Sequence, residues 1–279
     1  DRSTFYAESG GEVADAGTLE GEGGAMDVAD VQWAEGMILH AGKVSRGSVR
    51  VGDVLRTRPA PQRRAAVRRN HTATHLLHHA LRRVLGRHAD QAGSLVAPDH
   101  LRFDFTHVEA MTRDQIERVE DLVNERIRQN AGLSTRQTTV AEAKKEGAMA
   151  LFGEKYGERV RMVSIGDFSK ELCGGLHCAA TGDIGLFRIV SEQSVAAGVR
   201  RIEAVTGPGA VDFTRERERL LTRLAAALGS PVDRTPQAVE RLKSEIADLR
   251  REVQRLRQRR GPASASDLVS RADRIGETA

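Results

Sequence analysis

The sequence of 279 residues is poor in aromatic side chains and in cysteine. Aromatic residues make up 4% of it, so aliphatic side chains must supply most of any core. The two cysteines, Cys173 and Cys178, lie close together in a glycine-containing stretch and make a poor disulfide framework. With no signal-like start, this pattern favours a reducing compartment, where cysteines serve as metal ligands or nucleophiles.

Long apolar runs are absent as well, since none approaches the ~18 residues that a membrane span needs. Charged residues make up 29% of the chain and the net charge is +4. This modest basic excess is compatible with nucleic-acid binding, and equally with an arginine-rich composition that has no such role. The chain starts at Asp1, within what reads as a strand-rich unit, so we expect a fragment of a longer protein.

Short stretches of alternating residues, separated by glycine or aspartate, dominate the first 60 residues. They predict strands at 28–33, 36–41 and 49–56, which form a small β-barrel-like unit closed by Pro59 and Pro61.

Helical and strand patterns mix over residues 61–207. Helices are predicted at 62–86, 112–130 and 141–148, and strands at 94–97, 101–105, 136–140, 160–165, 184–191 and 200–206. Thr112, with Gln115 three residues later, predicts a capping box at the start of the second helix. Together these elements indicate an α+β fold.

The apolar pattern changes after residue 208. A first helix ends at Gly229, and a second carries apolar residues at alternating spacings of three and four: Val239, Leu242, Ile246, Leu249, Val253 and Leu256. This heptad spacing predicts a helical hairpin or coiled coil over 208–260, through which a homodimer could form. The alternative is an amphipathic helix packed on a core. Residues 261–279 read as a linker and the truncated start of a further domain.

Two half-sites carry candidate metal ligands. His71 and His75 lie four residues apart on a predicted helix, so both imidazoles project from one face, as in zinc sites built on helices. His78 and His79 leave other pairings open, and a histidine pair on a helix can also be a packed or solvated feature.

The second half-site is Cys173 and His177, which flank two glycines that let the backbone turn sharply. Together the half-sites predict one zinc site formed by His71, His75, Cys173 and His177. Cys178 reads as a small buried residue.

These motifs, with residues 5–11, 15–17, 71–77, 91–94, 101–105, 148–156 and 198–204, resemble the editing domain of alanyl-tRNA synthetases continuing into their helical C-terminal region. Free-standing alanyl-tRNA editing proteins share the zinc motifs, but the long helical segment suits the synthetases better. The chain departs from the family at Ser3-Thr4, where Thr-Pro is frequent. It also departs at Glu12, where glutamine is usual, and at Leu176, where the family has threonine.

The resemblance implies a cytoplasmic protein that hydrolyses the ester of tRNA(Ala) mischarged with serine or glycine, with Zn²⁺ on the four ligands named above. ATP-dependent ligation of alanine would belong to a part of the parent enzyme that precedes this chain. The implied domains are residues 1–60, the β-barrel-like subdomain; 61–207, the zinc-binding editing core; 208–260, the helical hairpin; and 261–279.

Cys173, with His71 and His75, is predicted to be essential for catalysis. The expected substrate contacts are Ser3, Gly10, Gly11, Glu12, Gly174, Gly175 and Leu176. Ser3 and Glu12 could bond the serine hydroxyl that alanine lacks, or be ordinary strand-end polar residues. Because Leu176 removes a polar group beside the metal, a second hypothesis is a tRNA-binding or dimerising module with structural zinc and no hydrolysis.

Three arginines are candidates for contacts to RNA phosphates or to the terminal adenosine: Arg102, Arg200 and Arg201. The alternative is that they form internal ion pairs with Asp104 and Glu203 on neighbouring strands.

Overall fold

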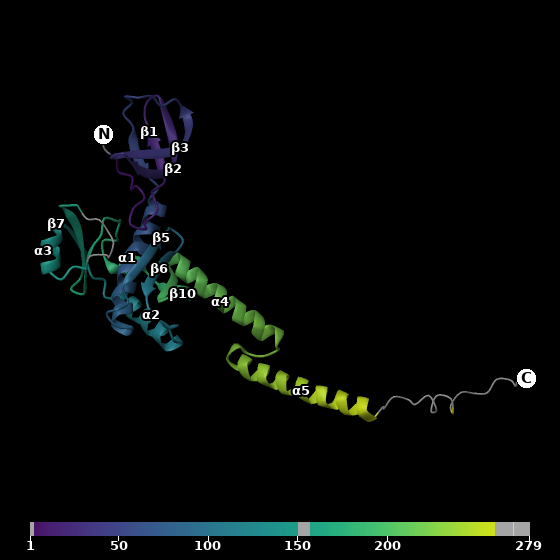
Figure 1. Cartoon of the computed structure of the whole chain (residues 1–279). Coiled ribbons are helices and arrows are strands. Elements are labelled where there is room, and N and C mark those ends of the chain that lie inside the picture. The colour runs from purple at the N-terminus through teal and green to yellow at the C-terminus, as the bar shows by residue number, and fades with distance from the viewer. Residues whose placement is uncertain (1–2, 150–156, 260–269, 271–279) are drawn as a thin grey trace, which may run out of the picture. The chain divides into compact units, whose positions relative to one another are not determined.

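The computed structural model describes residues 3–149, 157–259 and 270. It divides into two compact units, residues 1–213 and 214–279 (Figure 1). The motif expected at 148–156 and the linker expected at 261–279 fall almost entirely outside the described residues. Among the described residues, no helix combines the length and the apolar composition that a membrane span requires.

The first sheet is antiparallel, with its strands in the order β3-β2-β1-β4. Its strands are β1 (Gly17–Glu20), β2 (Gly24–Ala34), β3 (Met37–Gly47) and β4 (Arg56–Pro59). Phe5, Leu19 and Val31 pack on one side of it. The strand prediction at 49–56 is wrong over most of its length. Residues 51–54 are exposed, and pairing with β1 begins only at Arg56. The barrel-like closure stays a prediction.

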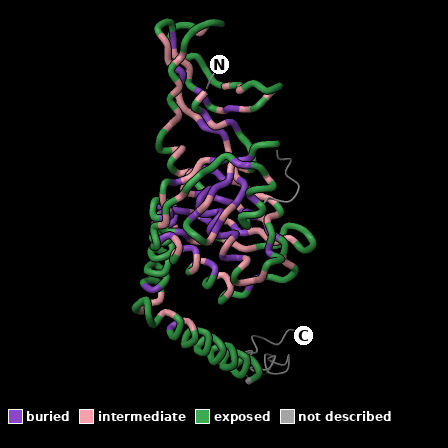
Figure 2. The backbone as a smooth tube through the Cα atoms, turned by 90° about the vertical axis from the view of Figure 1, so that its left-hand side faces the viewer, coloured by how far each residue is buried: buried purple, intermediate pink, exposed green. Residues whose placement is uncertain are grey.

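The second sheet forms the centre of the first unit, in the antiparallel order β10-β11-β6-β5. It consists of β5 (Gln91–Val96), β6 (Leu101–Thr106), β10 (Phe187–Ala196) and β11 (Val199–Thr206). Helices α1 (Pro61–Val84) and α2 (Arg113–Arg128) pack beside it and against each other. Leu76, Phe103 and Ile202 are fully buried there, in the region where Figure 2 shows most of the buried residues.

Local signals explain both long helices of this unit. Pro61 occupies the first turn of α1, where its missing N–H is not needed. Thr112 and Gln115 form the predicted capping box at the start of α2. Both helices therefore confirm the predictions at 62–86 and 112–130, within a few residues at each end.

The third sheet, in the order β7-β8-β9, leads into the cysteine loop. Its strands are β7 (Leu133–Thr138), β8 (Val160–Ile165) and β9 (Ser169–Leu172), and the short helix α3 (Val140–Lys145) follows β7. Strand β8 has the predicted bounds, whereas β9, of only four residues, was not predicted. Three antiparallel sheets and the helices confirm the α+β class.

Two long helices follow, α4 (Gly207–Ala227) and α5 (Thr235–Arg259). Gly229 has φ +59° and ends the first of them. On α5 the five heptad residues from Leu242 to Leu256 keep 40–54% of their surface exposed, and Figure 2 shows this helix exposed over most of its length. The helices are confirmed, while the hairpin packing, the coiled coil and the four-part domain division stay predictions.

Candidate metal centre

Helix α1 brings the first two candidate ligands together on its buried face. Its residues from Asn70 to His78 are all buried, so an imidazole there has lost its water. The rings of His71 and His75, one turn apart, are stacked with their centroids 5.3 Å apart and nearly parallel planes. The helix therefore presents two ring nitrogens in one direction, as the four-residue spacing predicted.

The loop after β9 brings the other two ligands to the helix. Arg161 on β8 fixes it: the Arg161 carbonyl accepts from the Cys173 N–H at 3.0 Å. Its guanidinium donates to the carbonyl oxygens of Gly174 and Gly175 at 3.0 and 2.5 Å. A Cβ at Gly175 would overlap the His71 ring and the Glu12 carboxylate, so only glycine allows this close approach.

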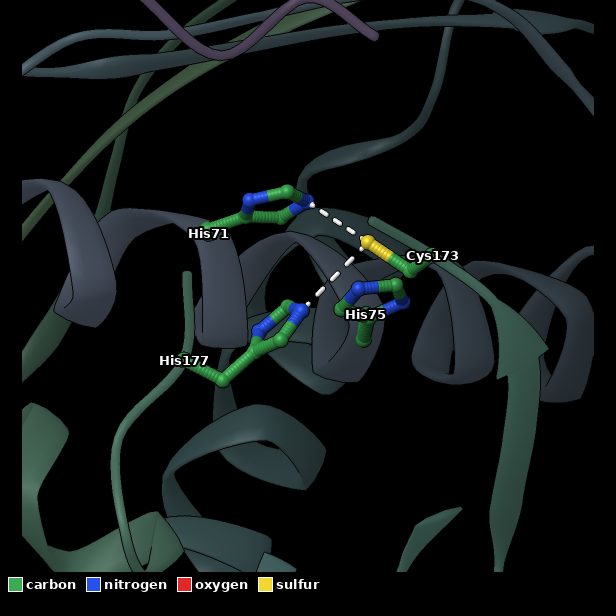
Figure 3. A group of neighbouring side chains, drawn as sticks. All are labelled: His71, His75, Cys173 and His177. Carbon is green, nitrogen blue, oxygen red and sulfur yellow. Dashed lines mark hydrogen bonds between the residues drawn. The ribbon is translucent and has the colours of Figure 1, made fainter. Parts of the chain in front are cut away.

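The four ligand atoms of His71, His75, Cys173 and His177 all lie within 4.8 Å of one another. The Cys173 Sγ lies 3.3 Å from both His71 Nε2 and His177 Nε2, and Figure 3 shows the four side chains turned toward a common point. Three imidazole nitrogens and one thiolate form a donor set typical of zinc. His78 and His79 instead lie against phenylalanine rings, so the structure favours the predicted pairing.

The four groups strongly shift one another's protonation. Burial alone would lower the pKa of His71, but Cys173 and Glu12 raise it to about 9. Burial would raise the pKa of Cys173, yet the surrounding histidines hold it well below its usual value. Burial together with the charge on His71 lowers the pKa of His177 to about 3. The cluster thus favours a thiolate, which is the form of cysteine that binds a metal.

Acidic side chains reach two of the histidines from outside the cluster. Glu171 Oε2 lies 2.7 Å from His75 Nδ1, and Glu12 contacts His71 Nδ1. Sequence reasoning gave Glu171 no role and expected Glu12 to contact substrate. Glu171 precedes Cys173 by two residues, so strand periodicity could have placed both on one face. Nothing in the sequence marks Glu12 as buried.

A cavity of about 130 Å³ adjoins the cluster. His71, His75 and Cys173 line it, together with three of the predicted substrate contacts, Gly10, Gly174 and Gly175. Sequence reasoning missed six polar lining residues: Tyr6, Ser9, Thr74, Gln91, Ser94 and Glu171.

Four predicted substrate contacts lie elsewhere. Ser3 bonds His40 at 2.8 Å, and Gly11 packs against Ser94. Glu12 is fully buried, and its carboxylate accepts a hydrogen bond from the backbone N–H of Leu176. None of the four is among the cavity's described lining residues.

The three arginines expected to contact RNA lie on β6 and β11, beside acidic side chains. Arg201 donates to both Asp104 oxygens at 2.6 and 2.7 Å, and Arg200 to both Glu192 oxygens at 2.5 and 2.7 Å. Arg102 lies 4.0 Å from Asp104. The structure therefore places all three arginines beside carboxylates, with Glu192 as the partner of Arg200, and the RNA contacts stay a prediction.

Two parts of the chain match family models of aminoacyl-tRNA synthetases. Residues 160–203, which include β8 and the cysteine loop, match the family model of the threonyl and alanyl tRNA synthetase second additional domain. Residues 1–61 match the model of class II (A) tRNA synthetases.

Alanine–tRNA ligases are similar to the chain over nearly its whole length. The ligase of Acetivibrio thermocellus is 48% identical over 276 residues, which cover 99% of this chain and 31% of that enzyme. The ligases of Xanthomonas axonopodis pv. citri and Listeria innocua are 48% and 47% identical over 273 residues, 98% of this chain and 31% of each enzyme. The chain thus spans less than a third of these curated relatives, and its resemblance to a segment of the alanyl-tRNA synthetases is confirmed.

Proposed function

We propose that this chain is the editing segment of an alanyl-tRNA synthetase and acts in the cytoplasm. It hydrolyses the ester that links serine or glycine to tRNA(Ala), at a zinc ion held by His71, His75, Cys173 and His177. The observation that carries the proposal is the convergence of these four ligand atoms beside a cavity that His71, His75 and Cys173 line. Ligation of alanine would reside in the part of the parent enzyme that this chain does not span.

Zinc bound at this cluster would polarise the ester carbonyl or lower the pKa of a water molecule. The protein's own groups orient the substrate. The cavity's hydroxyl and amide side chains, such as Thr74, Gln91 and Ser94, offer hydrogen bonds to an amino-acid hydroxyl. A site that bonds this hydroxyl rejects alanine, because alanine would leave its polar groups unpaired. The glycines at 10 and 174, where a Cβ would meet no atom within 4 Å, leave room for the aminoacyl end.

Cys173 is the residue on which this proposal is tested. We expect Cys173→Ala to abolish both zinc binding and deacylation of Ser-tRNA(Ala). Cys178→Ala is the matched control, because Cys178 is the chain's other cysteine and packs in the core instead. Treatment of the unmodified protein with a chelator should reproduce the effect of Cys173→Ala. Undiminished hydrolysis by Cys173→Ala would refute the catalytic role of this centre.

A second candidate function is a tRNA-binding or dimerising module in which zinc is purely structural. The observation that favours it is the ligand set itself, since four protein ligands close a tetrahedral zinc site and catalysis needs an open position. A protein that binds zinc but does not deacylate Ser-tRNA(Ala) at low concentration would support this candidate. Metal content alone does not separate the two, because both require zinc.

The remaining assignments concern partners. We propose tRNA contacts for Arg102, Arg200 and Arg201, and a homodimer through the exposed heptad positions of α5. The arginine role predicts that substitution weakens tRNA binding and makes it less dependent on salt.

A further inference from the structure

All three candidate histidine ligands have their Nδ1 atom engaged on the side away from the cluster. His75 Nδ1 lies 2.7 Å from Glu171 Oε2, and His71 Nδ1 contacts Glu12 Oε2. His177 Nδ1 lies 3.4 Å from the Thr72 hydroxyl, which itself donates to the Arg68 carbonyl. Each partner therefore accepts a hydrogen bond from Nδ1–H. This leaves the Nε2 lone pair for the cluster.

Glu12 differs from the other two partners in what it joins. Its Oε2 accepts from His71 on α1 and from the Leu176 N–H at 2.8 Å. One carboxylate oxygen thus connects the helix that carries two ligands to the loop that carries the other two. Gly175 makes room for this oxygen, because a Cβ there would overlap it.

Glu12 is buried with only one of its two carboxylate oxygens hydrogen-bonded. Its exposed fraction is 0%, and its second oxygen, Oε1, has no hydrogen-bond partner among the described residues. A buried carboxylate of this kind is unfavourable unless a positive charge lies nearby. A glutamine could accept the same two hydrogen bonds through its amide oxygen. The feature that glutamine lacks is the negative charge.

We propose that Glu12 is a positioning residue of the metal centre. It holds His71 with Nδ1 protonated and Nε2 directed at the metal, and its charge strengthens the hold of the site on a divalent cation. This inference rests on the proposed metal site. Hydrogen bonds from ligand histidines to carboxylates raise the basicity of the imidazole, and losing such a partner typically weakens metal binding about 10–100-fold.

Glu12→Gln tests the charge while preserving both hydrogen bonds. The zinc dissociation constant is measured by competition with a chromophoric chelator, for the unmodified chain and for the variant. We expect Glu12→Gln to bind zinc about 10-fold more weakly. Glu8→Gln is the matched control: it removes the same charge four residues away, at an exposed side chain that bonds Gln32. We expect it to leave the constant unchanged.

The outcomes separate the two proposals. If the unmodified chain binds no zinc, the metal site and the role of Glu12 both fail. If it binds zinc and Glu12→Gln binds equally well, only the role of Glu12 fails. An equal loss of zinc affinity in Glu8→Gln would also refute the role of Glu12. The effect would then come from overall charge rather than from the charge beside His71.

A measurement on the unmodified protein covers the case in which Glu12→Gln does not fold, as judged by circular dichroism. Long-range ¹H–¹⁵N spectra of the zinc-loaded chain distinguish the two ring nitrogens of each histidine. We expect His71 to carry its proton on Nδ1 and the metal on Nε2. Metal coordination through Nδ1 of His71 would overturn the proposal, since Glu12 could not then accept that hydrogen bond.

Discussion

Replacing Gly175 with alanine tests whether close contact between loop and helix sets the strength of the metal site. The new Cβ would overlap the His71 ring and the Glu12 carboxylate. Both of these side chains are buried, so neither can move aside into solvent. The loop must move instead, and with it Cys173 and His177, which flank Gly175.

The size of the effect follows from the cost of overpacking, which is about 1–3 kcal/mol in a well-packed interior. If the displaced loop returns to its position only when metal is bound, the overpacking cost reduces the free energy of metal binding by the same amount. Because about 1.4 kcal/mol corresponds to a factor of ten, we expect zinc affinity to fall roughly 5–150-fold.

The neighbouring glycine provides the control. A Cβ at Gly174 meets no atom within 4 Å, and the residue is exposed, so Gly174→Ala should bind zinc as the unmodified chain does. The assay is chelator competition for both variants, with thermal melting to confirm that each is folded. Equal zinc affinities for Gly174→Ala and Gly175→Ala would refute the reasoning.

Three further predictions address proton linkage, folding and assembly. Burial would lower the pKa of His71, but Cys173 and Glu12 raise it to about 9. Zinc must therefore displace a proton from His71, and zinc affinity should rise with pH up to about 9. Calorimetry in buffers of different ionisation enthalpy measures the released proton. A zinc affinity that does not change with pH would contradict this. Asn70 is buried, accepts a hydrogen bond from the Thr206 hydroxyl and donates one to a backbone carbonyl. Asn70→Ala should therefore lower the free energy of unfolding, measured by urea titration, by about 2–4 kcal/mol. Gln62 is exposed, so Gln62→Ala should change it little. Leu249, 54% exposed on α5, should be essential to the proposed dimer, so sedimentation should show Leu249→Glu as a monomer, and an unchanged dimer would exclude this interface.

Patterns of local origin were predictable from the sequence. The helix that carries His71 and His75 shows in its apolar periodicity, and the Thr112 capping box marks the start of the next helix. The four ligands could be proposed because histidine and cysteine at short spacings are typical zinc ligands. Strand β8 was predictable because it is buried and apolar.

Features that depend on distant contacts were not predictable. Glu12 lies in a glycine-rich stretch, where an acidic residue reads as exposed, and its burial follows from contacts with His71, 59 residues away, and with the Leu176 N–H. Strands β1 and β9 have four residues each, too few to establish an alternating pattern. The valines at 51 and 54 suggested a strand, but both are exposed, and pairing with β1 begins only at Arg56.

The distance along the chain between the two half-sites has a consequence for biosynthesis. His71 and Cys173 are separated by 102 residues, so at typical synthesis rates the first pair of ligands leaves the ribosome roughly 5–20 s before the second. Contacts between residues so far apart in sequence form late, because closing a long loop costs entropy before the contact can stabilise the chain. We therefore expect the ligands to converge only after β8 and β9 have paired and docked on α1. A metal ion that requires all four would bind the completed core and not its nascent fragments.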